Sequence, residues 1–324
     1  MSSIIYAGVG GTGPWSDGKY IAENGPDTFV KKLAIDWAYG PGKLYYRGPG
    51  VEGLGTNTTI VHQLVTEVME LRGKMKDCRG VVLCGHSRGG AAVIVAARRL
   101  MFYGVDIDCL ILLDPVNCTP WPESHFIPSN VKQVIKPIRN PFTKSRPLWG
   151  NCGSAWNPFT TTMDWDHFYG THASIGGQVW TADSLMLGYI YEPPEIGPTL
   201  VTLADDEACR RDVWNFFYPK MTKICDALME SGEPAAPPPT AIQPPPPSNG
   251  SGQKHTVVSG ESLSLISGKY WRDVLLWPIL WKANKSVVPN PNLIYPGQQL
   301  TVPSIAGYSK SQLDQARSEG RHWH

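Results

Sequence analysis

The stretch Gly80–Leu100, GVVLCGHSRGGAAVIVAARRL, decides the fold. It begins with an apolar run of strand length, passes through the pentapeptide GHSRG at residues 85–89, and continues into an Ala-rich segment of helical composition. A G-x-S-x-G pentapeptide between a strand and a helix is the sequence context of a nucleophile elbow, in which a strained turn raises the serine hydroxyl above the sheet. The pattern predicts that Ser87 is a nucleophile. A structural serine in a tight turn is the alternative.

The residues beside Ser87 fit the same interpretation. Side chains at Gly85 and Gly89 would collide with the neighbouring strand and helix. Arg88 opens the helix, and backbone N–H groups at a helix N-terminus stabilise a developing oxyanion. A second donor is expected from the loop after an early strand, and residues 8–13, GVGGTG, form such a glycine-dense loop. Phosphate binding is disfavoured there, because GVGGTG lacks the dinucleotide spacing and the Lys-Ser/Thr of a P-loop.

Apolar runs alternate with helical patterns along the first two thirds of the chain. Continuous apolar strands between helices are typical of a parallel sheet that is covered on both faces. The sequence therefore predicts an α/β fold with a mostly parallel sheet. From Pro115 to Asp166 the pattern gives way to Pro, Asn, Trp and Phe, which predicts a long irregular region. The expected elements are strands at Ile4–Ala7, Lys43–Tyr46, Gly80–Cys84 and Cys109–Leu113, and helices at Thr56–Met75, Gly89–Tyr103, from Ala182, and at Asp205–Met229.

The acid and the base should follow the serine in the order Ser, acid, His. Asp114 ends the strand LILLD, at the edge where open α/β sheets place their functional groups. Asp164 and Asp166 in MDWDH remain competing acids. His172 is the best candidate base, because it follows the acid and lies in the Gly-rich segment FYGTHASIGG, which can bend back over the sheet edge. The other histidines considered as bases are His62, His86, His125 and His167.

Several of these motifs together resemble a known family. GTGPW, YYRGPGVEGLGT, GHSRGGAAV, LILLDPV and FYGTHASIGG occur in that order. They resemble the α/β-hydrolases that include phospholipase effectors of bacterial type VI secretion. The resemblance implies Ser87 as nucleophile, His172 as base and Asp114 as acid, with Gly10, Gly11 and Thr12 in the oxyanion loop. The early family Asp is absent here, and Gln178 replaces the last Gly of the histidine block.

A proline-rich segment divides the chain at residues 232–253. The stretch PAAPPPTAIQPPPPSNGSG has eight prolines and ends in Ser and Gly. Proline runs form extended polyproline II spacers and Ser/Gly runs form flexible joints, so we interpret it as a linker after a hydrolase domain at 1–231. Residues 1–253 carry 21 Lys+Arg and 24 Asp+Glu, a net charge of −3. Residues 254–324 carry 8 and 4, a net charge of +4.

Residues 254–303 predict a small β-α-α-β domain before a polar tail at 304–324. The segments VVSGESL, WPILWKAN and NPNLIYPGQQL resemble a LysM domain. This resemblance implies binding of glycans that contain N-acetylglucosamine, such as peptidoglycan or chitin, in a groove between two loops. A packing or scaffold role is the alternative. The residues that match the two loops are Gly260, Glu261, Ser262, Asn290, Asn292, Leu293 and Ile294.

Composition narrows the class of protein. A net charge of +1 on 324 residues gives no general attraction to nucleic acid. No apolar run approaches the roughly 20 residues that span a bilayer. Residues 1–13 lack the basic and apolar regions of a signal peptide. The seven cysteines include no C-x-x-C pair, which disfavours a disulfide framework or zinc ribbon. Cys84, Cys109 and Cys225 are expected in the core.

The sequence thus predicts a serine ester hydrolase, of the lipase or phospholipase kind, joined to a peptidoglycan-binding LysM domain. We expect no metal and no cofactor, because no His/Cys/Asp group has ligand spacing. The expected partners are a lipid or other ester, a glycan, and a secretion or immunity protein, with no nucleic acid. We expect synthesis in the cytoplasm and delivery to the envelope or periplasm by a non-Sec route. The alternatives are a cell-wall ester hydrolase and a non-catalytic LysM-bearing envelope or spike-associated protein.

Overall fold

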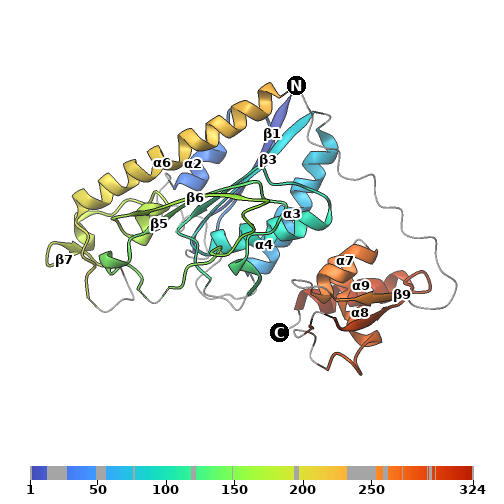
Figure 1. Cartoon of the computed structure of the whole chain (residues 1–324). Helices are drawn as coiled ribbons and strands as arrows, with labels where there is room; N and C mark the ends of the chain where they lie inside the picture. The colour runs from blue at the N-terminus through green and yellow to red at the C-terminus, as the bar shows by residue number, and fades with distance from the viewer. Residues whose placement is uncertain are drawn as a thin grey trace. The chain divides into compact units, whose positions relative to one another are not determined.

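The structure is a computed structural model, and the chain in it divides into two compact units, Met1–Pro237 and Pro238–His324 (Figure 1). All but Gln253 of the predicted linker lies outside the described residues. Each unit is therefore treated by itself. The structure describes residues 2–12, 28–48, 56–75, 77–117, 122–147, 149–192, 197–231, 253–257, 262–271, 273–289, 291, 294–295 and 297–322.

The first unit is built on a six-stranded sheet of order β2-β1-β3-β4-β5-β6, in which every neighbouring pair is parallel. Parallel strands need crossover connections, and α2, α3 and α4 supply three of them. This arrangement confirms the predicted α/β class. The strands are β1 (Ser3–Val9), β2 (Lys43–Tyr46), β3 (Cys78–His86), β4 (Cys109–Leu113), β5 (Gln133–Arg139) and β6 (Thr162–Phe168).

Helices cover both faces of the sheet (Figure 1). Alternate residues of β1 show the two faces: Ile5 packs with α3 (Thr56–Lys74) and α4 (Arg88–Phe102), whereas Ile4 packs with α2 (Phe29–Ile35) and α6 (Leu203–Glu230). Burial on both faces explains why β1, β3 and β4 are almost wholly apolar. Their side chains form the two halves of the core of this unit.

Two strands lie inside the region that the sequence predicted to be irregular, and that prediction was wrong for β5 and β6. Their sequences, QVIKPIR and TMDWDHF, are too polar for the apolar-run criterion. The polarity is tolerated because β6 forms the edge of the sheet and because β5 pairs with β4 only at Val134 and Ile135. Pro137 lies beyond that pairing, where a missing N–H costs no ladder hydrogen bond to β4.

The segment after His172 also differs from the prediction. A helix was expected from Ala182, but Ala182–Ser184 is a single 3₁₀ turn. A short hairpin of β7 (Leu185–Met186) and β8 (Tyr189–Ile190) follows it. The closing helix α6 was predicted nearly in full. It begins with a capping box, in which Thr202 Oγ1 accepts from Asp205 N and Asp205 Oδ2 accepts from Thr202 N.

The second unit has the predicted β-α-α-β order. β9 (Gln253–Thr256) and β10 (Gln299–Val302) pair antiparallel, and α7 (Leu263–Trp271) and α8 (Trp277–Ala283) lie between them in the chain. The polar tail contains one further helix, α9 (Lys310–His322). Ala316 of α9 packs against Leu276 and Ile279, and Arg317 pairs with Asp273 at 2.7 Å, so the tail is part of this unit.

Candidate active site

Ser87 lies on a sharp turn between β3 and α4, as the elbow motif predicted. Its φ and ψ angles are 56° and −127°, a region that non-glycine residues rarely adopt. Hydrogen bonds hold the backbone there: Ser87 N donates to Leu113 O at 3.1 Å, and Ser87 O accepts from Gly90 N and Val116 N, both at 3.0 Å. The surrounding sheet therefore stabilises the strained backbone that raises the serine.

The elbow glycines are needed because backbone approaches backbone at this point. A Cβ at Gly85 would meet the carbonyl of Gly89, and a Cβ at Gly89 would meet the carbonyls of Val9 and Gly10. A Cβ at Gly90 would lie 2.6 Å from Pro115 Cβ. The expectation that side chains at Gly85 and Gly89 would collide with neighbouring elements is confirmed.

The structure brings Ser87, His172 and Asp114 together, although 58 residues separate the last two in sequence. His172 Nε2 lies 2.8 Å from Ser87 Oγ, and His172 Nδ1 lies 2.6 Å from Asp114 Oδ2. An ionised carboxylate only accepts hydrogen bonds, so Nδ1 carries the proton and Nε2 accepts from the serine hydroxyl. All three side chains are buried. This chain of hydrogen bonds has the connectivity of a Ser-His-Asp triad.

The competing residues lie elsewhere. Asp164 accepts from Gln133 Nε2 and lies 3.6 Å from Lys220 of α6. Asp166 is exposed and accepts from the backbone N–H of His167. Neither carboxylate contacts His172, so Asp114 is the acid that the geometry favours.

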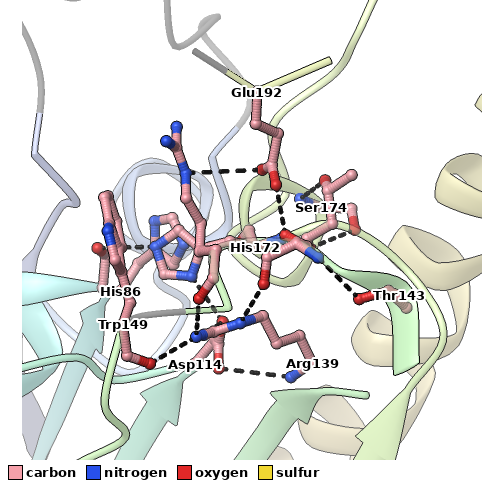
Figure 2. A network of polar contacts seen from close by, with 12 residues as sticks. His86, Asp114, Arg139, Thr143, Trp149, His172, Ser174 and Glu192 are labelled. Carbon is pink, nitrogen blue, oxygen red and sulfur yellow. Dashed lines mark hydrogen bonds and ion pairs between the residues drawn. The ribbon is translucent and has the colours of Figure 1, made fainter. Parts of the chain in front are cut away.

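Arg139, at the end of β5, also binds the Asp114 carboxylate, at the same oxygen that His172 contacts. Its Nη1 donates to Asp114 Oδ2 at 2.5 Å, and its remaining contacts are the carbonyls of Ser145, Arg146 and Trp149 (Figure 2). Burial raises the pKa of Asp114, but the hydrogen bond and charge of His172, together with Arg139, outweigh burial and lower that pKa to about 2. Asp114 is therefore a carboxylate at neutral pH.

Two neighbours fix the position of His172. Ser145 Oγ accepts from His172 N at 2.6 Å and donates to Glu192 Oε2 at 2.5 Å. Glu192 is buried, and burial raises its pKa. The indole of Trp149 lies edge-on to the imidazole, with 5.2 Å between the ring centroids. Figure 2 shows His172 among these side chains.

The backbone before His172 is tied to α6. Asp206 Oδ1 accepts from both Thr171 N, at 3.0 Å, and Thr171 Oγ1, at 2.8 Å. Thr171 Oγ1 in turn caps the short helix α5 (His172–Ile175) by accepting from Ser174 N. The base thus stands at the first position of a capped turn that is anchored on a separate helix.

His86 supports His172 and is not a competing base. Its Nε2 lies 3.0 Å from the carbonyl oxygen of His172, and because a carbonyl only accepts, Nε2 carries the proton. Burial, together with the charge of His172, lowers the pKa of His86 to about 3, so the ring is neutral. Gly11 and Gly176 leave room for this imidazole, since a Cβ at either position would overlap it.

The four residues that were expected to form the oxyanion hole differ in whether they can offer a hydrogen-bond donor near Ser87. The N–H of Gly10 donates to Tyr46 O at 2.9 Å within the sheet, so the expectation that Gly10 supplies a donor was wrong. Gly11 lies against the nucleophile, because a Cβ there would come within 3.4 Å of Ser87 Cβ. Thr12 Oγ1 is buried and has no partner among the described residues. Arg88 is the first residue of α4, directly after Ser87.

Sequence reasoning missed Arg139, Ser145 and Glu192. Arg139 carried a usable signal, since it ends a parallel strand, much as Asp114 directly follows one, but β5 itself was not recognised. Ser145 and Glu192 lie in irregular segments that the tertiary structure brings together. The six cysteines among the described residues are buried and form no disulfide with one another, and Cys84, Cys109 and Cys225 lie in the core as expected.

The predicted glycan-binding residues lie largely outside the described residues, namely Gly260, Glu261, Asn290, Asn292 and Leu293. Ser262 precedes α7, with its Oγ 2.9 Å from Ser264 Oγ, and Ile294 packs against the core of the second unit. Across the residues that the structure covers, no group of three His, Cys, Asp or Glu side chains forms a metal site. In the same residues, no helix combines the length and apolar character needed to cross a membrane.

Together, the doubly covered parallel sheet and the serine elbow at its C-terminal edge define an α/β-hydrolase fold. The second unit matches a described family: residues 255–303 match the LysM domain. A segment of 51 residues, 16% of the chain, is 41% identical to the potassium binding protein Kbp of an Escherichia coli strain. The match spans about a third of that protein, 34% of its length.

Solved structures similar to the first unit include three described as hydrolases, esterases or thioesterases. A YdeN-like hydrolase from Pectobacterium atrosepticum is 10% identical with a TM-score of 0.33, covering 69% of this chain and 92% of its own. A metagenomic carboxyl esterase is 12% identical with a TM-score of 0.33, covering 68% and 76%. A type II thioesterase from the borrelidin biosynthetic cluster is 12% identical with a TM-score of 0.28, covering 52% and 83%. Similarities of this size do not indicate a shared activity.

Proposed function

We propose that the first unit is a serine-dependent hydrolase of carboxylic esters. The observation that carries the proposal is the hydrogen-bonded chain from Ser87 Oγ through His172 to Asp114, with distances of 2.8 and 2.6 Å. A serine hydroxyl becomes an effective nucleophile only when an adjacent base removes its proton. Here the base is within reach, the acid holds it in the right tautomer, and the serine stands on a strained elbow.

In the proposed reaction, Ser87 Oγ attacks the ester carbonyl carbon as its proton passes to His172 Nε2. Asp114 stabilises the imidazolium through Nδ1–H. The tetrahedral intermediate collapses, and the leaving alcohol takes the proton back from Nε2. Water then attacks the acyl-enzyme by the same path, which releases the acid and restores Ser87.

The negative charge on the substrate oxygen needs donors above the elbow. We assign this role to the backbone N–H of Arg88 at the start of α4 and to the Gly11–Thr12 segment. Gly11 lies against Ser87, and the unpartnered hydroxyl of Thr12 is a further donor close to it in the chain. The helix dipole of α4 adds to the stabilisation.

We further propose that the ester is a lipid ester such as a phospholipid. This finer statement rests on the resemblance of GHSRGGAAV and FYGTHASIGG to type VI secretion phospholipase effectors. The LysM match supports binding of peptidoglycan or another N-acetylglucosamine glycan by the second unit. Binding to the wall through a tether raises the enzyme's local concentration at a neighbouring membrane.

This proposal includes a place of action at the bacterial envelope, with synthesis in the cytoplasm and delivery by a non-Sec route. A secretion partner and an immunity protein fit an antibacterial toxin of this kind. A cell-wall ester hydrolase is the second candidate function. The LysM match favours it, since the same module would place the enzyme directly on wall glycan.

The test is hydrolysis of short p-nitrophenyl esters and of phospholipid vesicles by the wild-type chain and by Ser87→Ala. Removal of the nucleophile is expected to lower kcat by about three orders of magnitude or more. Turnover of both substrates that is lost in the variant supports a lipolytic enzyme. Turnover of short esters alone favours the cell-wall candidate. No turnover by the folded wild type, or turnover unaffected by the substitution, overturns the proposal and favours a non-catalytic LysM protein.

A further inference from the structure

A cavity of about 490 Å³ lies beside the serine site. Lys136 and Ile138 of β5 line it, as do Met163 and Trp165 of β6. Val134 and Met163 pack into the same half of the core as α3 and α4, so the cavity lies on that face of the sheet, at its β5–β6 end. Residues of the irregular stretches 145–147 and 149–156 also line it. The cavity borders Asp114 and Trp149 rather than Ser87.

The first polar group in the cavity is a buried amine. Lys136 is only 6% exposed, and its Nζ donates to Cys152 O at 2.8 Å and to Gly153 O at 3.0 Å. An ammonium group has three N–H bonds, so one donor remains beyond these two contacts. Burial lowers the pKa of Lys136 to about 8, which leaves the amine largely protonated at neutral pH.

The second polar group is an acceptor. Asn151 lines the same cavity, and its Oδ1 is buried with no hydrogen-bond partner among the described residues. A buried acceptor without a partner destabilises the structure that holds it. A ligand that donates to Asn151 Oδ1 would remove that destabilisation.

Three indole side chains contribute to the apolar lining of the cavity. Trp149 and Trp156 line it from the irregular stretches, and Trp165 lines it from β6. Trp165 is 53% exposed and Trp156 is 38% exposed, which is high for the largest apolar side chains. Exposed aromatic faces beside a few convergent polar groups are typical of small-molecule sites.

We propose that this cavity is a carbohydrate-binding site that takes a pyranose ring. A sugar hydroxyl is both donor and acceptor, so one hydroxyl or an adjacent pair can donate to Asn151 Oδ1 and accept from Lys136 Nζ. The C–H faces of the ring would pack against the indoles. An acyl chain satisfies neither polar group, and a carboxylate cannot donate to Asn151. This site is independent of the LysM unit and does not require ester hydrolysis by Ser87.

The test uses the full chain carrying Ser87→Ala, so that no substrate is turned over. N-acetylglucosamine and glucose are titrated by saturation-transfer NMR, with decanoate as the acyl-chain comparator. Asn151→Leu removes the unpartnered acceptor, and Trp165→Ala removes a stacking face. Phe159→Ala is the matched control, because Phe159 is 96% exposed and does not line the cavity. The LysM unit is present in every variant, so its contribution is constant.

We expect at least one of the two sugars to bind, with a Kd about tenfold weaker in Asn151→Leu and Trp165→Ala and unchanged in Phe159→Ala. The thermal midpoint of Asn151→Leu should not fall, since no protein hydrogen bond is lost. Equal affinities in all variants would place sugar binding on the second unit and overturn the proposal. Binding of decanoate alone, or of none of the three probes, would also overturn it. None of these results depends on whether Ser87 is a nucleophile.

Discussion

The elbow and the segment that carries the base are built in different ways. Ser87 is fixed by its own strand and helix and by bonds to the adjacent strand β4 and the residues after it, such as Ser87 N to Leu113 O at 3.1 Å and Val116 N to Ser87 O at 3.0 Å. His172 is fixed by partners distant in sequence: Asp114, Ser145 and His86 lie 58, 27 and 86 residues away. The nucleophile is therefore held by its own strand and helix and by one neighbouring segment, whereas the base is held by several separate segments.

The largest effect is expected at Asp114, the partner of the base that is distant from it in sequence. Asp114→Asn keeps the shape of the side chain but removes its negative charge. If the amide NH2 group faces Nδ1, it donates to that atom, and the imidazole is then held in the wrong tautomer. We expect kcat for p-nitrophenyl esters to fall by about 10³–10⁴-fold, with the fold intact. Asp166→Asn is the control, because Asp166 does not contact His172. Equal losses in the two variants would mean that the observed hydrogen bond does not serve the reaction.

Arg139 tests how the base is assembled, because its side chain binds both Asp114 and the carbonyl groups of residues 145–149 beside His172. Arg139→Met removes the ion pair and the donors to three carbonyl groups. We expect kcat to fall about 100-fold, and the acid-side midpoint of kcat/KM to move to higher pH, since the Asp114 charge would then act on His172 alone. Arg139→Lys should recover part of the activity. A loss of stability with no change in the pH profile would assign Arg139 a purely structural role.

His86 links the two regions and makes stability depend on pH. The folded state keeps this ring neutral with a pKa of about 3, whereas an unfolded histidine has a pKa of about 6.5. The unfolded chain therefore binds the proton more readily between these values, and stability falls as pH drops below about 6.5. Between pH 7 and pH 5, this difference in the pKa of His86 should lower the free energy of unfolding by about 2 kcal/mol.

That contribution is measured by urea unfolding of the wild type and His86→Gln at both pH values. The glutamine amide can still donate to the carbonyl of His172 but does not titrate. The difference in stability between pH 7 and pH 5 should be smaller in the variant by about the same 2 kcal/mol. Identical pH dependence in the two proteins would show that His86 is not kept neutral by the fold.

Ser145 is expected to give the smallest effect. Ser145→Ala removes the acceptor for His172 N and leaves Glu192 without the hydroxyl that donates to it. We expect kcat to fall about tenfold with KM unchanged, because the backbone of the base loses one of several restraints. Ser145→Thr retains a hydroxyl and should restore most of the activity. A change in KM alone would indicate a substrate-binding role instead.

The same contrast explains which strands could be predicted. β1, β3 and β4 are buried on both faces and are almost wholly apolar, so each contains an apolar run that the sequence shows clearly. β5 and β6 carry Lys136, Pro137, Asp164 and Asp166, and they lie toward and at the sheet edge. Their pairing depends on neighbours distant in sequence, which local composition does not reveal.

The sequence by itself determined the elbow, the order of Ser87, Asp114 and His172, the division of the chain and the LysM unit. Each is signalled by a short pattern in the chain, such as the G-x-S-x-G pentapeptide at residues 85–89 or an apolar run of strand length. Only the tertiary structure chose Asp114 over Asp164 and Asp166, engaged the N–H of Gly10 in the sheet, and placed Arg139, Ser145 and Glu192 around the base. Those outcomes depend on hydrogen bonds between distant segments. Such bonds form only when the strands of the sheet have assembled and water has been excluded from the site.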